Sequence, residues 1–477
     1  MRYIQGIDRN QTTIFPEVVD DYIKENSSVR FIDAYVDSLD FVKLGFTYSE
    51  TKDTGRKPYN PGDLLKLYIY GYLNKIRSSR QLESATHRNI ELIWLMRRLQ
   101  PDFKTIADFR KDNTRSIRDV CRDFTLFCKK LELFGRELIA IDGSKFKASN
   151  SNRRNFTKNK LSKLIKKIDD EIDSYLDDLD EGDEKEKDVK QPSTEELKEK
   201  IDQLRKHKAK YQKLQSELNQ SGETQISLTD PDSRMMQSHQ GKDVAYNVQI
   251  VTDSKHKLIV THAVTNEIND MKQLHPMSVQ AKEVLEIEEL DAVADAGYFE
   301  RENIKQCHDD QIKTYVPQPT RSHNKSLRLY TNADFFYHSK QDTYQCPAGQ
   351  TLTFRGYRIR KESGITEKKY TTHACYACPQ KAKCTRSKTT RYISRWEHEK
   401  IIEQLDQRMK KNPERIKQRK ALVEHPFGTI KHWMGHHHFL TRGIDNVSAE
   451  MSLSVLVYNL KRVLNIVDFK ELMTVVA

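Results

Sequence analysis

The 477-residue sequence predicts a mixed α/β protein with an all-helical N-terminal region and two inserted segments. Apolar residues recur at helical spacing through the first 136 residues, and from about residue 240 they alternate as they do in strands. Two amphipathic helices and a cysteine-rich stretch interrupt the α/β part. We therefore expect six segments, which are residues 1–136, 137–157, 158–220, 221–319, 320–395 and 396–477.

The composition is that of a polar chain with a basic excess. Charged residues make up 31% of the sequence, and the net charge is +12. Segment 158–220 holds 15 Lys or Arg against 17 Asp or Glu, so the basic excess lies outside it. Such an excess favours a polyanionic partner, with nucleic acid first. Apolar runs are far shorter than a membrane helix and residues 1–10 carry no signal-peptide pattern, so we expect a cytoplasmic protein.

The N-terminal helices are rich in Arg and Lys. Capping signals at residues 60–61, 78–81 and 105–108 mark helix starts, and the last two predict single helices over 82–96 and 106–131. Short helices of this kind suit a helix-turn-helix-like DNA-binding module, although an ordinary bundle with a solvated basic face explains the pattern equally well. The candidate phosphate contacts are Arg77, Arg80, Arg88, Arg110, Lys111 and Arg115.

A short apolar strand is predicted over residues 138–141, followed at once by Asp142 and Gly143. Asp-Gly after a strand is a strong turn signal, so the simpler interpretation is a turn. The alternative is a metal ligand at the edge of a sheet. Asp142 alone does not decide between them.

Residues 158–220 are predicted to form an antiparallel helical hairpin. Apolar residues step at helical spacing on both sides of the acidic stretch "DDLDEGDEKEKDVKQPST". This insertion carries no recognisable catalytic pattern, so we expect it to serve packing or partner contact.

Two more carboxylates, one at the end of a predicted strand and one on a predicted helix, could meet Asp142 at one edge of a sheet. Asp295 ends an apolar strand in "VADAGYF", and Glu424 lies in a basic helix in which Pro426 is expected to produce a kink or a new start. Glu424 also has the spacing of a simple ion pair with Lys420. Three carboxylates without thiol or imidazole suit Mg²⁺ or Mn²⁺, and the basic residues around Glu424 suit DNA phosphates. These basic residues are Lys417, Arg419, Lys420 and Lys431.

Several motifs in order carry a resemblance to a known family. "IAIDGSKFKA", "YNVQ" with "VTNEINDMKQL", "VADAGYF" and "VEHPFGTIKHWMG" resemble the DDE transposases of bacterial insertion sequences. The helical stretch "PYNPGDLLKLYIYGYLNKIRSSRQLE" resembles the N-terminal domain of the same group. The resemblance runs from about residue 40 to 465, and the order of the motifs makes it specific.

The resemblance implies an RNase H-like catalytic domain with Asp142, Asp295 and Glu424 as the catalytic and metal-binding triad. It implies cutting at the ends of an element and transfer of the ends into target DNA, with two divalent ions clamping the reacting oxygens. Lys431 follows Glu424 at the family spacing. Lys417 and Lys420 stand where the family has Tyr and Arg, so base stacking and a bidentate phosphate contact are lost there.

Four cysteines, Cys346, Cys375, Cys378 and Cys384, fall within 39 residues in the spacing C-x28-C-x2-C-x5-C. In a chain without an export signal this spacing favours structural Zn²⁺, with His373 as an alternative ligand. Reduced cysteines without metal remain the competing interpretation.

Three functions remain open at this point. The leading expectation is a transposase that acts on double-stranded DNA, at the terminal repeats of its element and at a target, as a homodimer on DNA in the bacterial nucleoid. An RNase H-like nuclease that only hydrolyses would use the same acids. A domesticated DNA-binding regulator without catalysis is the third, and an intact set of three acids argues against it.

Overall fold

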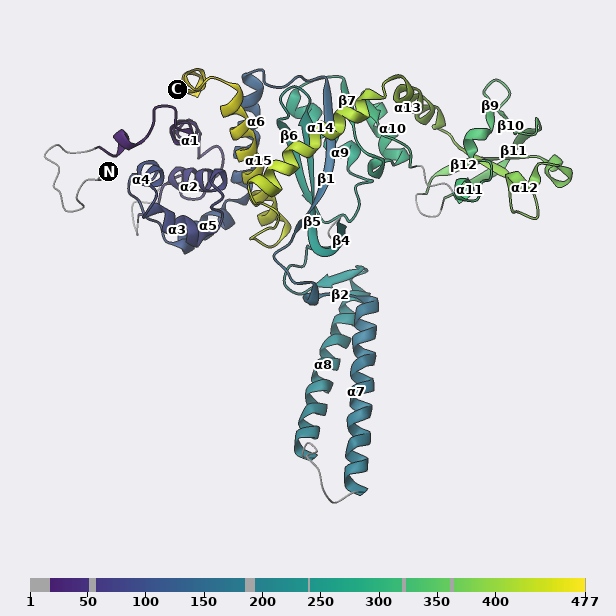
Figure 1. The fold of residues 1–477 in the computed structure, drawn as a ribbon, viewed down its shortest axis with the longest axis horizontal. Helices are drawn as coiled ribbons and strands as arrows, with labels where there is room; N and C mark the ends of the chain where they lie inside the picture. Colours follow the sequence, from purple (N-terminus) through teal and green to yellow (C-terminus); the bar gives the residue numbers. More distant parts are fainter. Residues whose placement is uncertain are drawn as a thin grey trace, which may run out of the picture.

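The computed structural model describes residues 18–50, 57–184, 194–238, 241–319, 323–360 and 364–476. It confirms the mixed α/β class. Figure 1 shows a central sheet with helices around it, an all-helical region on the N-terminal side, a long helical hairpin that projects away, and a small β-rich part at the far end.

The N-terminal region is built from short helices that pack on a shared core with the rest of the molecule. Asn60 caps its helix through a hydrogen bond from the Gly62 amide, as the sequence predicts. The helices are η1 (Val19–Tyr22), α1 (Ser28–Asp37), α2 (Pro61–Leu73), α3 (Ser79–Thr86), α4 (Ile90–Leu95), α5 (Phe103–Asp112) and α6 (Thr114–Lys130).

Two helices predicted as single are each broken in two. The break between α3 and α4 occurs because the Asn89 side chain accepts a hydrogen bond from the Leu92 amide and starts a new helix. The break between α5 and α6 lies at Asn113, whose side-chain oxygen accepts from the Thr47 amide. Asn competes with the helix backbone for hydrogen bonds, which is why both breaks fall on Asn.

The central sheet has six strands in the order β4-β5-β1-β7-β8, with β6 also paired to β5. β5 pairs antiparallel with β1, β4 and β6, whereas β1, β7 and β8 are parallel to one another. The strands are β1 (Leu138–Lys147), β4 (Arg234–Ser238), β5 (Gly241–Asp253), β6 (Ile259–Thr265), β7 (Leu290–Val293) and β8 (Ile312–Tyr315).

The turn interpretation of Asp142 and Gly143 is wrong, because β1 runs straight through both residues to Lys147. β5 pairs with β1 over this whole length, with Asp142 opposite Ile250 and Gly143 opposite Gln249. Long-range pairing with β5 therefore overrides the local turn tendency of Asp-Gly.

Helices cover both faces of this sheet. α14 crosses the face that carries Asp142, and Leu422 and Val423 of α14 pack there on Leu138 and Ala140. α9 lies against the other face, where Gln280 is hydrogen-bonded to Thr261 of β6. These and the remaining helices around the sheet are α9 (Leu274–Leu285), η3 (Ala296–Tyr298), α10 (Arg301–Asp309), α13 (Glu399–Lys411), α14 (Glu414–Gly428), η6 (Thr429–Trp433), α15 (Ile444–Ile466) and α16 (Phe469–Val476).

Pro426 does not start a new helix, so the restart expected as one alternative is wrong. It lies inside α14, which continues into the π-helical turn η6. Pro426 is buried, and the wider π turn after it accommodates the altered backbone hydrogen bonding.

The insertion at 158–220 holds α7 (Lys158–Glu184) and α8 (Thr194–Gln220), which pack on each other and project from the body (Figure 1). Ile168, Ile172 and Ile201 form one small core between them. At the base, η2 (Asn152–Arg154) leads into β2 (Asn155–Thr157), which pairs with β3 (Gln225–Ser227). The acidic stretch predicted between the helices lies partly outside the described residues, at 185–193.

The cysteine-rich segment contains a separate five-stranded antiparallel sheet in the order β13-β12-β11-β10-β9. Its core is formed by Phe335, Tyr344, Leu352, Tyr370 and Ile393. The elements are α11 (His323–Ser326), η4 (Asn332–Asp334), β9 (Phe336–His338), β10 (Thr343–Gln345), β11 (Thr351–Ile359), β12 (Thr366–Thr371), η5 (His373–Ala377), α12 (Lys381–Cys384) and β13 (Tyr392–Trp396). Within the described ranges of the whole chain, none of the helices combines the length and apolar character needed to cross a membrane.

Candidate active site

Asp142 and Asp295 are brought together by the register of two parallel strands. β1 and β7 pair with Ala140 opposite Val293, so two residues further on Asp142 comes level with Asp295. β7 ends at Val293, and Asp295 caps the short helix η3 by accepting a hydrogen bond from the Gly297 amide at 2.7 Å. Both acids line one cavity of about 760 Å³ between β1 and α14, which we call the catalytic cavity.

Arg419 of α14 bonds both carboxylates through the same nitrogen atom. Its Nη2 lies 2.7 Å from Asp142 Oδ1 and 3.2 Å from Asp295 Oδ2. Burial raises the pKa of Asp142 to about 6; the neighbouring Asp295 adds to this rise, and Arg419 opposes it. The Arg419 Nε is buried and has no hydrogen-bond partner among the described residues. Two acids therefore share one cation in this structure.

Glu424 lines the same cavity from α14. Its side chain is 64% exposed and pairs with Lys420 at 3.7 Å. Lys431, seven residues further on, donates to Ser144 Oγ at 2.6 Å and to the Lys145 carbonyl at 2.8 Å. Burial lowers the pKa of Lys431 to about 8, against the opposing charge of Asp142. One helix thus supplies the third acid and a partly desolvated lysine.

Gly143 is required by a hydrogen-bond network on the other face of β1. A Cβ atom at this position would lie 2.3 Å from Gln249 Nε2 and 2.6 Å from Asp270 Oδ1. Asp270 Oδ1 accepts from Asn247 and Gln249, each at 2.7 Å. Gln249 in turn accepts a hydrogen bond from the Tyr298 hydroxyl, on the turn that Asp295 caps. The network therefore fixes the turn of Asp295 relative to β1.

The predicted DNA contacts near Glu424 occupy different environments. Lys417 and Lys420 are exposed, and Lys420 lines the catalytic cavity together with Lys431. Arg419, predicted to bind DNA phosphate, instead binds Asp142 and Asp295 because its side chain reaches inward from α14.

Two predicted DNA contacts in the N-terminal region are buried. Arg77 pairs with Glu450 at 3.5 Å and donates to the His438 carbonyl at 2.9 Å. Arg110 donates to the Tyr72 hydroxyl at 3.2 Å. Each is 8% exposed, so both guanidinium groups bind inside the protein and are not available to a phosphate. The other four residues are exposed, which are Arg80, Arg88, Lys111 and Arg115.

Sequence reasoning missed two groups of site residues. Lys145 and Lys147 line the catalytic cavity and pair with Asp270 at 3.3 Å and Asp243 at 3.1 Å. Gln249 and Tyr298 of the network were also missed. The motifs "YNVQ" and "VADAGY" contain these two residues, so both were noticed in the sequence as parts of these motifs. The sequence did not show that Gln249 and Tyr298 contact each other in the fold.

The four cysteines Cys346, Cys375, Cys378 and Cys384 surround one small cavity of about 20 Å³. All four are free and half-buried. His373 is exposed and does not line that cavity. Over the described part of the chain, no group of three or more His, Cys, Asp or Glu side chains is placed to hold a metal ion.

Comparison with family models identifies the class of protein. Residues 345–464, which include Glu424 and Lys431, match the model described as "Transposase DDE domain". Residues 17–112 match the model described as "Transposase domain (DUF772)". The chain is therefore a transposase. The two matched stretches support the insertion-sequence DDE transposase that the motif order predicts.

Solved structures add only a weak likeness. The piggyBac transposase synaptic complex with hairpin DNA matches at 9% identity and TM-score 0.32, over 94% of this chain and 79% of that chain. A pre-cleavage Mos1 transpososome matches at 9% identity and TM-score 0.16, over 57% of this chain and 64% of that chain. TM-scores this low do not define a shared fold. No curated protein matches the chain in sequence.

Proposed function

We propose that this transposase binds the ends of its mobile element and cuts and joins DNA at the catalytic cavity, with Asp142, Asp295 and Glu424 as catalytic acids. The observation that carries the proposal is the level placement of Asp142 and Asp295 on two parallel strands, with a single cation shared between them. The strand order, an antiparallel β1-β5-β6 meander followed by parallel β7 and β8, supports the RNase H-like class that the motifs imply.

The donor chemistry of the cavity fits a hard divalent cation. Two carboxylates bond one positive group there, and a third lines the same cavity from α14. Carboxylate oxygens are the donors that Mg²⁺ and Mn²⁺ prefer. Asp142, Asp295 and Glu424 would hold the metal, which activates the attacking oxygen and stabilises the leaving oxygen of a phosphodiester.

Residues of the chain itself supply the remaining charge. Lys145, Lys147, Lys420 and Lys431 line the cavity and offer ammonium groups to DNA phosphates. Lys431 is anchored on β1 through Ser144, so its charge is positioned before a substrate enters. Exposed Arg80, Arg88, Lys111 and Arg115 extend the basic surface over the N-terminal helices. Two element ends must be held together during joining, so we expect a homodimer on DNA.

The test uses the full chain and a plasmid that carries its own insertion element with both flanks. The variants D142N, D295N and E424Q should each reduce cleavage at least about 1,000-fold in Mg²⁺ or Mn²⁺, because each removes a metal-binding oxygen without changing side-chain volume. D291N is the matched control, since Asp291 is on β7 but bonds Tyr315 and Arg415 away from the cavity. Cleavage by D142N at the wild-type rate would refute the assignment.

Sequencing of the products separates a transposase reaction from hydrolysis alone. Element ends joined to new target DNA show strand transfer. Cut ends that never join would support the nuclease that only hydrolyses, with the same three acids.

Zinc in the cysteine-rich segment is a second part of the proposal. The four thiols belong to two connections of the five-stranded sheet and face one cavity, and a small movement inward would make them a tetrahedral thiolate set. Metal analysis of the purified protein should find about one zinc per chain, lost in the variant C375S/C378S. The variant C121S is the control, because Cys121 is buried in α6. Wild-type protein without zinc would favour reduced cysteines.

A further inference from the structure

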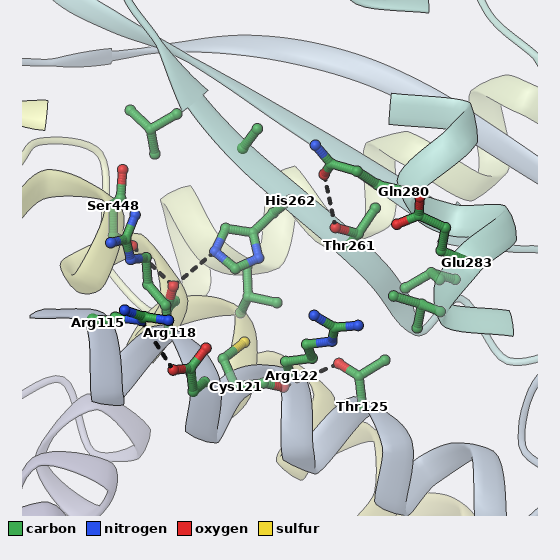
Figure 2. Close-up of a pocket in the computed structure, with 17 residues that line it drawn as sticks. Arg115, Arg118, Cys121, Arg122, Thr125, Thr261, His262, Gln280, Glu283 and Ser448 are labelled. Atoms are coloured by element: carbon green, nitrogen blue, oxygen red, sulfur yellow. Dashed lines mark hydrogen bonds and ion pairs between the residues drawn. The ribbon is translucent and has the colours of Figure 1, made fainter. Parts of the chain in front are cut away.

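A second cavity lies away from the catalytic acids, between the N-terminal region and the outer edge of the sheet. It has a volume of about 510 Å³ and is bordered by α6, the edge strand β6, α9 and α15. Figure 2 shows α6 running along its lower side, with β6 above and Gln280 and Glu283 of α9 to one side. We call it the α6 cavity.

Three arginines of α6 point at this cavity from one stripe of the helix. Arg115, Arg118 and Arg122 are spaced by three and four residues, so they share one face over roughly 10 Å of helix length. That length matches about three phosphates of one DNA strand, which are spaced by about 3.4 Å along the duplex axis. In Figure 2, Arg122 extends from α6 toward the space between β6 and α9.

The charges of these arginines are only loosely matched inside the protein. Arg115 pairs with Asp119 at 3.9 Å and Arg118 pairs with Asp445 at 3.8 Å, and both pairs are solvent-exposed. Surface pairs of this length contribute little. Arg122 has no ion pair or side-chain hydrogen bond within the ranges that the structure describes. All three side chains are therefore available to an external anion.

Part of the cavity lining is polar and uncharged. Hydroxyl groups of Thr261 and Ser448 and the amide of Gln280 form it. His262 is half-buried and shares a hydrogen bond with Ser452 at 2.9 Å, and desolvation together with the nearby charge of Arg118 lowers its pKa to about 4, so it stays neutral at physiological pH. Two acids also line the cavity, Glu283 on α9 and Asp119 on α6, and Asp119 is already paired with Arg115, so the three arginines outnumber the acids. Neutral donors beside arginines are suited to phosphate oxygens.

We propose that the α6 cavity binds the phosphates of a DNA strand through Arg115, Arg118 and Arg122, as a surface separate from the catalytic cavity. This inference rests on the proposed DNA transposition. It adds a DNA-binding surface between the N-terminal helices and the edge strand β6 of the central sheet. The N-terminal region and the sheet would then bind the same DNA strand.

The test measures DNA affinity as a function of salt with the full chain and a fluorescent 30-base-pair duplex of arbitrary sequence. Each phosphate contact contributes about 0.9 to the slope of log K against log salt concentration. The variant R118Q/R122Q should therefore lower the slope by nearly two. The control R205Q/K206Q removes the same charge from the exposed surface of α8 and should leave the slope unchanged.

Three results would overturn the inference. An unchanged slope in R118Q/R122Q, or an equal loss in R205Q/K206Q, would show that the cavity makes no specific contact. Binding of AMP by the wild type that is lost in R118Q/R122Q, with the DNA slope unchanged, would assign the cavity to a free nucleotide.

The inference and the proposed function fail in different ways. If R118Q/R122Q keeps the wild-type slope while D142N still loses cleavage, only the inference fails. If the wild-type chain binds no DNA, both fail. Circular dichroism melting of each variant shows whether the fold is intact.

Discussion

The catalytic cavity and the α6 cavity flank the same sheet but differ in how their positive charges are matched. In the catalytic cavity, Arg419 bonds two carboxylates within 3.2 Å, and Lys145 pairs with Asp270. In the α6 cavity, the pairs of Arg115 and Arg118 are at 3.9 and 3.8 Å. The difference shows that basic residues of one chain have two separate roles. Some hold the acids in place, and others are left for an external anion.

The largest expected effect is in the catalytic cavity, at Gly143. G143A should lower the free energy of unfolding by about 3 kcal/mol, because the new Cβ would overlap Gln249 and Asp270. Chemical denaturation measures this change. G428A is the control, since a Cβ at Gly428 in α14 meets no atom within 4 Å. Equal stability of G143A and wild type would show that the network does not fix β1.

The next effect concerns acid sensitivity in the α6 cavity, at His262. The pKa of His262 is about 4 in the folded chain, below the ordinary histidine value of 6.5, so below pH 6.5 the unfolded state binds the proton first. Stability is therefore lost as pH falls from 6.5 toward 4. At pH 4.5 the loss from His262 is about 2 kcal/mol.

H262Q should remove that part of the acid sensitivity. Denaturation at pH 7.5 and pH 4.5 compares wild type, H262Q and H87Q, in which an exposed histidine is replaced. The loss should be smaller only in H262Q. If wild type and H262Q lose the same stability, His262 is not held neutral by its surroundings.

A smaller effect is expected where Arg419 bonds the two acids. R419Q leaves Asp142 and Asp295 without their shared cation, which should cost about 1 kcal/mol without metal, since Asp295 is half-exposed. Mn²⁺ should then raise the melting temperature more in R419Q than in wild type, because the cation position is free.

The control for this comparison is R415Q, on the same helix. Arg415 pairs with Asp291 at 3.4 Å, whereas the ion pairs of Asp142 and Asp295 are with Arg419. Its Mn²⁺ response should equal that of wild type. If R419Q also responds like wild type, Arg419 does not occupy the metal position.

The smallest effect on stability is expected at Glu424. Its carboxylate pairs with Lys420 on the surface, so E424Q should change the free energy of unfolding by less than about 0.5 kcal/mol. E399Q is the contrasting variant, because Glu399 bonds Arg301 in a half-buried pair and its loss should cost more. A large loss of stability in E424Q would mean that Glu424 has a structural role.

Much of the architecture could be predicted from the sequence because it depends on local periodicity. The helical hairpin follows from apolar spacing, and the start of α2 follows from its capping signal at residues 60–61. The order of the motifs gave the family. These features are carried by residues near one another in the chain.

What could not be predicted depends on residues far apart in the chain. β1 passes through Asp142 and Gly143 because β5 pairs with it, and no local pattern contains that pairing. Arg77 is buried by Glu450, 373 residues away, and Arg419 turns toward Asp142, 277 residues away. The sequence alone does not distinguish a basic residue that binds DNA from one that pairs with a carboxylate of the same chain.

The two-stranded β2–β3 pair at the base of the hairpin has a consequence for the length of the insertion. Asn155, Phe156 and Thr157 pair with Ser227, Ile226 and Gln225, so the entry and exit of the insertion are held side by side. Residues between these strands can be lengthened, shortened or replaced without displacing β1 or β5. The β2–β3 pair therefore separates the length of the projecting arm from the geometry of the sheet that carries Asp142.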